Sequence, residues 1–267
     1  MNKLFDNLEC IYRGLKNENK TIHCLTNPIA INDMANVILS LGQSPIMADN
    51  PREVKEITEK SAVLLLNLGN IKDYRMEAME KSAKVANLIP IPLILDLVGV
   101  SASKLRLDFA LNLLKAYKFD LVKGNYSEIY SLYEEKTSTS GVDSKDLDYL
   151  SITKKANILS QKYDTKILAS GKKDIVCGNK QTYILANGDY RLKKITGSGC
   201  ILGAICACSL AIENSLEAII LGLCIENISS ENIDKNIGMA SFKLKFLDKI
   251  SLIDIETIKE RIAYEKY

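Results

Sequence analysis

The sequence lacks several features that would have narrowed its function at once. It has little excess charge, because 35 Lys and Arg residues against 33 Asp and Glu residues leave a formal net charge of +2. A nucleic-acid-binding protein needs a dense basic surface, so this balance argues against that class. No hydrophobic run reaches the ~18 residues that span a bilayer, and the charged N-terminus does not resemble a signal peptide. We therefore expect a cytoplasmic protein with neither a nucleic-acid nor a membrane partner.

Cysteine and histidine patterns exclude further classes. The seven cysteines form no Cys-x-x-Cys pair, and His23 is the single histidine. A zinc site and a disulfide framework are therefore disfavoured, and we expect reduced, mostly buried thiols. With no Ser–His–Asp or Cys–His arrangement indicated, acyl transfer has little support. A structural, hydrogen-bonded role for His23 is favoured over that of a catalytic base.

What the sequence does contain is an alternation of apolar strands and helices over 267 residues, 47% of them hydrophobic. This pattern predicts right-handed βαβ units and a mostly parallel sheet with helices on both faces. Short strands expected over 175–194 suggest an antiparallel edge. With no linker visible, we expect a single domain over 1–267. The expected strands lie at 21–25, 44–48, 62–68, 92–96, 119–122 and 165–169. The expected helices include an opening helix with Leu4, Leu8, Ile11, Tyr12 and Leu15 on one face, a helix starting at Asn50, and helices over 30–41, 73–88, 103–117, 144–163, 200–213, 215–229 and 237–246, with a loop at 137–143 and a terminal helix after Ser251 or Asp254.

A glycine turn, Thr196-Gly-Ser-Gly-Cys200, directly precedes an apolar segment. Glycines permit close approach of a ligand, and the start of a helix offers free N–H groups and a positive dipole end to an anion such as phosphate. The alternative, a turn that merely starts a buried helix, is equally well supported. The position of Cys200 at a helix start predicts a lowered thiol pKa and reactivity, and the alternative is a small residue that fills space.

Other polar residues stand at the ends of expected strands, where ligands bind in parallel sheets. Asp96 ends an apolar strand, and a site residue is favoured there over a capping one. Asn125 and Glu128 could organise Mg²⁺ and its waters or could form a helix capping box. Ser170 could contact a nucleotide or belong to an ordinary turn, and Asn27 could cap the next helix.

Taken together, these segments resemble one family. His23-Cys-Leu-Thr-Asn27, Asn36 and Leu41-Gly-Gln-Ser-Pro-Ile-Met-Ala48 are similar to the N-terminal signature of hydroxyethylthiazole kinases. In the family's order follow Leu66-Asn-Leu-Gly69, Leu95-Asp-Leu-Val-Gly99, Gly124-Asn-Tyr-Ser-Glu128, Gly141-Val-Asp143 and Thr196-Gly-Ser-Gly-Cys200. The resemblance covers residues 20 to 212. Cysteine at the last position of the glycine turn, here Cys200, is typical of this family, whereas the wider ribokinase-like superfamily usually has aspartate there.

The resemblance implies a fold and an activity. The fold would be a ribokinase-like three-layer α/β/α domain, with a mostly parallel central sheet and a short antiparallel edge. The reaction would be ATP-dependent phosphorylation of the hydroxyl of 4-methyl-5-(2-hydroxyethyl)thiazole in thiamine salvage, with Mg²⁺ required. The protein would form a homotrimer with active sites between subunits.

The resemblance also implies roles for individual residues. Met47, Gly197 and Asn27 would contact the thiazole, and Lys123 and Ser170 would contact ATP, where we also place Asn125. Asp96 and Glu128 would hold Mg²⁺, and Cys200 would lie beside the substrate hydroxyl as an acceptor of its proton or as an orienting group. Three departures are Leu97, where the family usually has proline, Lys123, where it has arginine, and Pro28, where it often has an aromatic residue.

Two other functions remain open at this point. An ADP-dependent NAD(P)H-hydrate dehydratase of the same superfamily would use a similar glycine turn, but with aspartate in place of Cys200. A non-catalytic paralogue that binds thiazole or nucleotide would account for Leu97 and Lys123, yet it would have no need to keep Asn125, Glu128 and Cys200.

Overall fold

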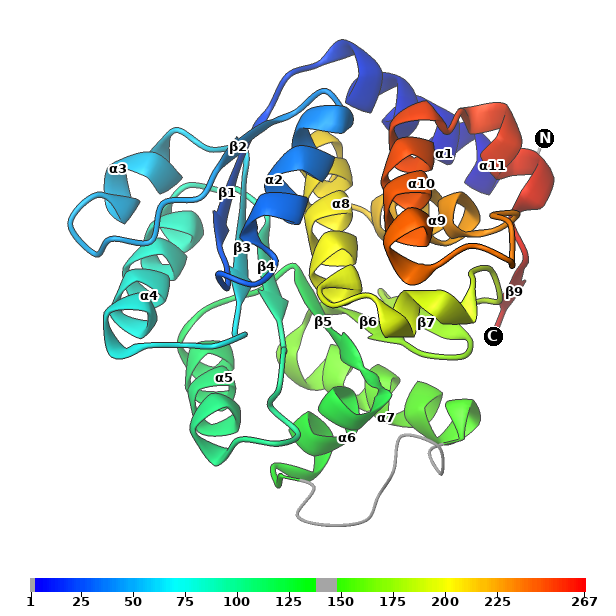
Figure 1. Ribbon diagram of the computed structural model, residues 1–267. Helices are drawn as coiled ribbons and strands as arrows, with labels where there is room; N and C mark the ends of the chain where they lie inside the picture. The colour runs from blue at the N-terminus through cyan, green and yellow to red at the C-terminus, as the bar shows by residue number, and fades with distance from the viewer. Residues whose placement is uncertain (1–2, 138–147) are drawn as a thin grey trace.

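A computed structural model describes residues 3–137 and 148–267 (Figure 1). One nine-stranded sheet runs through the molecule in the order β2-β1-β3-β4-β5-β6-β7-β8-β9. The strands from β2 to β6 are parallel, and β7, β8 and β9 are added antiparallel. The strands are β1 (Thr21–Leu25), β2 (Ser44–Ile46), β3 (Val63–Asn67), β4 (Leu93–Asp96), β5 (Leu121–Asn125), β6 (Lys166–Ser170), β7 (Asp174–Gly178), β8 (Gln181–Leu185) and β9 (Tyr264–Lys266).

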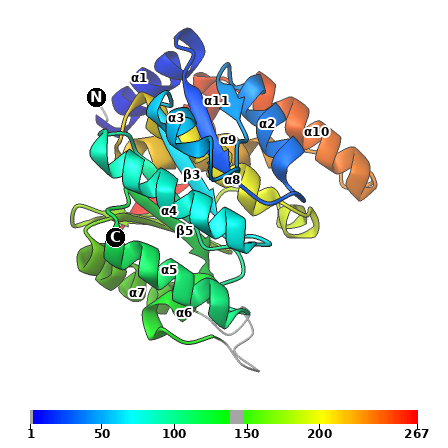
Figure 2. The ribbon, with the colours of Figure 1, turned by 90° about the vertical axis from the view of Figure 1, so that its left-hand side faces the viewer.

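Helices cover both faces of the sheet and make three layers. One face carries α1 (Lys3–Asn17), α2 (Ile31–Ser40), α8 (Ser198–Ile212), α9 (Leu216–Ser230), α10 (Met239–Leu252) and α11 (Ile255–Arg261), which share one apolar cluster. The other face, turned to the viewer in Figure 2, carries α3 (Val54–Glu59), α4 (Asp73–Leu88), α5 (Lys104–Ala116), α6 (Tyr126–Glu134) and α7 (Tyr149–Tyr163) over a second cluster. The continuous apolar strands follow from this double cover, since neither face of their residues meets water.

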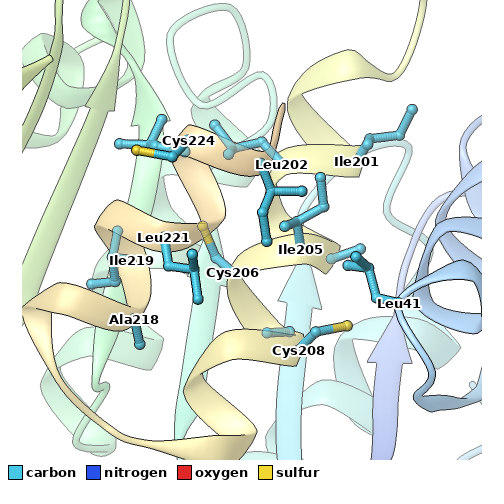
Figure 3. Packing of buried hydrophobic residues seen from close by; sticks show 14 of the residues in the cluster. Leu41, Ile201, Leu202, Ile205, Cys206, Cys208, Ala218, Ile219, Leu221 and Cys224 are labelled. Atoms are coloured by element: carbon cyan, nitrogen blue, oxygen red, sulfur yellow. The ribbon is translucent and has the colours of Figure 1, made fainter. Parts of the chain in front are cut away.

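The helix that follows the glycine turn lies in the middle of its layer. Its side chains are buried from Cys200 to Leu210, because it packs against α9 as well as α2, α1 and the sheet. Figure 3 shows Cys206 of α8 facing Leu221 of α9 across their contact. This surrounding explains why the segment is apolar on every side and not amphipathic.

The expected α/β fold with an antiparallel edge is confirmed. The short strands expected over 175–194 are β7 and β8, and a 3₁₀ helix, η1 (Tyr190–Lys194), follows them. Four details of the expectation were wrong. The strand expected at 119–122 is β5, which continues to Asn125. The helix expected over 237–246 is α10, which continues to Leu252. The helix expected from Asn50 begins at Val54, because the Asn50 side chain accepts a hydrogen bond from the Arg52 N–H and forms a turn first. Strand β9 was not expected.

Two expectations fall wholly or partly on residues that the structure does not describe. The loop at 137–143, apart from Thr137, lies outside the described residues, and so do the first four residues of the helix expected over 144–163. The motif Gly141-Val-Asp143 lies there too.

Candidate functional site

The parallel strands bring polar side chains from distant parts of the sequence to one edge of the sheet. In the strand register, Asn67 at the end of β3 lies beside Asp96 at the end of β4, and Asp96 lies beside Lys123 of β5. One step further along, Asn125 at the end of β5 lies beside Ser170 at the end of β6. This is the carboxyl edge of the sheet, where ligands bind in folds of this kind.

Three of these side chains and Asn27, which follows β1, form a continuous hydrogen-bonded row. We call these four residues, Asn27, Asn67, Asp96 and Lys123, the strand-end row. The Asn27 amide donates to Asn67 Oδ1 at 3.0 Å, and the Asn67 amide donates to Asp96 Oδ2 at 2.9 Å. Lys123 Nζ donates to Asp96 Oδ1 at 3.1 Å. All four residues are buried, and buried polar groups require such partners.

Lys123 is charged in spite of its burial. Burial disfavours the ammonium ion, but the nearby Asp96 carboxylate, with Cys200 and Glu128, raises the pKa of Lys123 above its usual range. A cation held this way at a strand end can attract an anionic ligand. Lysine at this position supplies a point charge and not the bidentate fork of an arginine.

The glycine turn points the start of α8 at the same place. Gly197 has φ +86°, a conformation that favours glycine, and a Cβ there would approach the Ala30 side chain to 3.2 Å. A Cβ on Gly199 would lie 3.7 Å from Lys123 Nζ, so the first turn of α8 stands next to the ammonium group. The free N–H groups of a helix start and a buried ammonium ion together favour an anion at this edge.

Cys200 contacts the strand-end row directly. Its Sγ lies 3.4 Å from the Asn27 amide nitrogen and 3.3 Å from the Asn67 amide nitrogen, and both amides donate to it. The lowered thiol pKa expected from its place at a helix start was wrong. Burial and the Asp96 carboxylate raise the pKa of Cys200, and these effects outweigh Lys123 and the two amides. Cys200 is therefore a protonated, hydrogen-bonded thiol at neutral pH.

Asn125 and Glu128 form the capping box that the sequence left open as one of two roles. The Asn125 side chain accepts from the Glu128 N–H at 3.0 Å, and Glu128 Oε2 accepts from the Asn125 N–H at 2.8 Å. Glu128 Oε1 accepts from the Gly99 N–H at 2.8 Å. Burial raises the pKa of Glu128 to about 7, although these two N–H groups oppose the rise. Glu128 thus joins the start of α6 to the loop after β4.

That loop contains Leu97, where the sequence departs from the family that it resembles. Leu97 is buried in the second apolar cluster, and Arg106 donates to the Val98 carbonyl at 3.2 Å. With Gly99 bonded to Glu128 as well, the loop is held by side chains from α5 and α6. A proline is therefore not needed to fix the turn after Asp96.

Three predicted positions remain: Ser170, Met47 and His23. Ser170 is half-buried at the end of β6, and Met47 is half-buried just after β2, where it packs against the first apolar cluster. The structural role expected for His23 is confirmed, because its ring bonds to Thr58 Oγ1 at 3.0 Å and to the Ala48 carbonyl at 2.9 Å. Burial lowers the pKa of His23 to about 4, so the ring is neutral.

Sequence reasoning missed three buried polar residues near this edge. Asn67, which bonds to Asn27, Asp96 and Cys200, stands at the end of an apolar strand, as Asp96 does, so the same signal could have found it. Glu226 is a buried acidic residue within the apolar helix α9, and its Oε1 has no hydrogen-bond partner among the described residues. Burial raises its pKa to about 8 against the attraction of Lys123. Asp174 begins β7, and it accepts hydrogen bonds from Gly171 and Asn227.

Two observations concern the rest of the molecule. A hollow lined by Ala86, Asn87, Pro90, Ile91, Lys118, Asp120 and Asn214 lies at the opposite, amino edge of the sheet, since Asp120 directly precedes β5. It is separate from the strand-end row. Within the described ranges, no helix combines the length and apolarity that crossing a membrane requires.

Comparison with known proteins agrees with this geometry. A family model described as "Hydroxyethylthiazole kinase family" matches residues 13–256. The chain is 52% identical to a hydroxyethylthiazole kinase of Finegoldia magna, over 100% of this chain and 99% of that one. It is 39% identical to hydroxyethylthiazole kinase 2 of Clostridium botulinum, over 96% and 99% of the two chains.

Solved structures give the same result for the fold. The structure of a hydroxyethylthiazole kinase protein from Pyrococcus horikoshii matches with a TM-score of 0.89 at 25% identity, covering 98% of this chain and 99% of that one. A pyridoxal kinase from Staphylococcus aureus in complex with AMP-PCP and pyridoxal matches with a TM-score of 0.64 at 14% identity, over 94% and 99% of the chains. A ribokinase-like superfamily protein from Enterococcus faecalis matches with a TM-score of 0.61 at 10% identity, over 87% and 86%. The three-layer fold is therefore ribokinase-like.

Proposed function

The chain belongs to the hydroxyethylthiazole kinase family, and from that premise we propose that it transfers the γ-phosphoryl group of ATP to the hydroxyl of 4-methyl-5-(2-hydroxyethyl)thiazole in thiamine salvage. The observation that carries the proposal is the meeting of Cys200 with the strand-end row at the start of α8. A helix start and a buried ammonium ion favour a phosphate there, and we propose that the acceptor hydroxyl lies beside the adjacent thiol.

We assign the two substrates to two parts of the edge. The thiazole side comprises the residues near β1, β2 and the glycine turn: Asn27, Met47 and Gly197. The ATP side comprises residues at the ends of β5 and β6: Lys123, Asn125 and Ser170. Support for the division comes from the register, which places Asn125 beside Ser170, and from the close approach of Gly197 to Ala30, three residues after Asn27.

Asp96 and Glu128 fit Mg²⁺ by their donor chemistry. Each of their four oxygens already accepts one N–H group, and each keeps a lone pair for a second partner. Such carboxylates suit a cation that is bound largely through water, as Mg²⁺ prefers. When bound, Mg²⁺ would neutralise charge on the phosphates. The protein's own part is to hold Asp96 at the end of β4 and Glu128 in the first turn of α6.

The chemical step needs positioning more than a strong base. The alcohol oxygen forms a bond to the γ-phosphorus while the bond to the ADP oxygen breaks, and the transition state of such transfers is loose in most analyses. The N–H groups of the glycine turn and the Lys123 ammonium would stabilise the charge on the moving phosphoryl oxygens. Because its pKa is raised, Cys200 acts chiefly by orienting the hydroxyl and not by removing its proton beforehand. The hydroxyl proton leaves as the bond to phosphorus forms and passes to an oxygen of the transferred phosphoryl group.

We extend the proposal to the oligomeric state and the cellular location of the protein. We propose a homotrimer with active sites between subunits, which light scattering at working concentration tests, and a monomer would contradict it. The single sheet supports treatment of 1–267 as one kinase domain. A cytoplasmic location fits an enzyme that draws on ATP.

One assay separates the kinase from its two rivals. We expect ADP release that requires both the thiazole alcohol and Mg²⁺, tested on a panel of thiazole and pyrimidine alcohols. An NAD(P)H-hydrate dehydratase would act on the hydrate with ADP, and a non-catalytic paralogue would bind without turnover. Folded protein that shows no turnover with the thiazole alcohol at millimolar concentration would refute the assignment. Family membership and Cys200 both favour the kinase.

A further inference from the structure

A buried pair from β7 and α9 holds the turn that follows β6. Asp174 Oδ1 accepts from the Gly171 N–H at 2.9 Å, and Asp174 Oδ2 accepts from the Asn227 amide at 2.6 Å. Both Asp174 and Asn227 are buried. Because β7 runs antiparallel to β6, its first residue Asp174 stands at the carboxyl edge of the sheet, directly across the turn from Ser170.

The same turn is also fixed from the side of α6. The Tyr126 hydroxyl donates to the Lys173 carbonyl, and a methyl group at Gly171 would overlap the Tyr126 ring. The backbone of Gly171 therefore lies directly on this ring, with no room to shift toward it. Asp174 and Tyr126 therefore hold the turn from two sides.

The end of α9 holds a second loop at this edge. The Asn227 side chain packs against Gly188, and Ser230 Oγ accepts from the Asp189 N–H at 2.9 Å. That loop follows β8, which ends at the same edge as β6, since β8 is antiparallel to β7. Asn227 thus lies between the Gly171 turn and the Gly188 loop and connects them to one helix.

We propose that Asp174 and Asn227 are positioning residues for the nucleotide: through their hydrogen bond they set the Ser170–Gly171 turn where it receives ATP. The inference rests on the proposed function, because it takes the ends of β5 and β6 as the nucleotide side. Neither residue touches the reacting atoms. Their effect is expected on nucleotide affinity and not on the chemical step.

The test weakens the pair and then restores it with reversed polarity. In Asp174→Asn, the new side chain cannot accept from both Gly171 and Asn227, so one buried donor loses its partner. We expect the Kd for ATP with Mg²⁺, measured by calorimetry without any alcohol, to rise about tenfold. In the double variant Asp174→Asn/Asn227→Asp, the amide at 174 can again accept from Gly171 and donate to 227. We expect its Kd to return to within about threefold of the parent.

The chain offers a matched control at the far edge of the sheet. Asp120 likewise accepts from one backbone N–H, that of Leu93, at 2.9 Å and from one asparagine amide, that of Asn214, at 2.6 Å. Asp120 is half-buried and its bond to Asn214 is exposed, so Asp120→Asn makes the same chemical change at a less buried pair away from the nucleotide side, and the Kd for ATP should be unchanged. In steady state, only Asp174→Asn should raise the KM for ATP, with kcat and the KM for the thiazole alcohol preserved.

Four results would contradict the positioning role, the proposed function, or both. An unchanged Kd in Asp174→Asn, a double variant no better than the single one, or an equal rise in both KM values would overturn the inference. If Asp174→Asn does not fold, Asn227→Ala supplies the same test, because it removes the amide donor and leaves Asp174 bonded to Gly171. A parent that binds no ATP overturns the proposed function as well, whereas a parent that binds and variants that bind equally well overturn the positioning role alone.

Discussion

Replacement of Glu226 by glutamine should make the protein more stable, and increasingly so as the pH rises. Glu226 is 4% exposed, and one of its carboxyl oxygens has no hydrogen-bond partner among the described residues. Burial raises its pKa to about 8 from 4.5. The folded chain therefore holds a proton that the unfolded chain releases between these two values. Glutamine copies the shape of the protonated acid and carries no such proton.

The sign and size of the effect follow from proton linkage. Below pH 4.5 the parent and the Glu226→Gln variant are both neutral at this position, so their free energies of unfolding differ little. Between about 4.5 and 8 the parent loses roughly 1.4 kcal/mol per pH unit relative to the variant. The relative loss is about 2 kcal/mol between pH 5 and 6.5 and roughly 3 to 4 kcal/mol between pH 5 and 8. Above the folded pKa the difference levels off.

Urea unfolding at pH 5, 6.5 and 8 measures this difference from the midpoint and slope. All samples must have the same protein concentration, because any assembly of subunits makes the midpoint depend on it. The exposed residue Glu260 of α11 supplies the control, since the same Glu→Gln change at the surface should alter the free energy of unfolding by no more than about 0.5 kcal/mol. A Glu226→Gln difference that does not change with pH, or that shrinks toward pH 8, would refute the reasoning.

Three further substitutions test the site itself. Glu128→Gln should lower turnover strongly and the melting temperature modestly, because the glutamine side chain is uncharged and can accept from only one of the Gly99 and Asn125 N–H groups. A variant with full turnover would leave Glu128 only its capping role. Cys200→Asp should keep substantial activity, since aspartate can accept the same amide N–H groups, while Cys200→Ala should be slower but active. Steady-state rates compare the two variants with the parent. An alanine variant as fast as the parent would show that the thiol only fills space. Gly197→Ala should raise the KM for the thiazole alcohol and reduce the free energy of unfolding by about 1 kcal/mol. The reason is that the φ of +86° and the nearby Ala30 both oppose a side chain at this position. Kinetics equal to those of the parent would show that the turn adapts.

Local patterns in the sequence were enough to predict the layers and much of the carboxyl edge. Alternating apolar strands and helices predicted the parallel sheet, and Asp96 was identified because a carboxylate ended an apolar strand. The Asn125–Glu128 spacing indicated, as one of two possible roles, the capping box that is present. These features depend on residues close together in the chain, so a short window of sequence contains their physical cause.

What the sequence could not predict depends on contacts between distant segments. The raised pKa of Cys200 comes from burial and from Asp96, 104 positions earlier, whereas the local signal contained only the helix start. The partner of Asn227 is Asp174, and nothing in either neighbourhood indicates the other. Strand β9 has only three residues, and its pairing with β8 spans some 80 positions, so no hydrophobic pattern marked it.

The enclosure of α8 has a consequence for how such an enzyme could acquire a new acceptor. This helix is packed by neighbouring helices and by the sheet, and no side chain from Cys200 to Leu210 reaches the surface. A change of volume there disturbs the whole layer, while the half-buried Met47 and the exposed Ile29 can be exchanged with few neighbours to satisfy. We therefore expect new alcohol substrates, in evolution or in engineering, to arise from substitutions near the glycine turn, such as at Met47 or Ile29, while α8 stays unchanged.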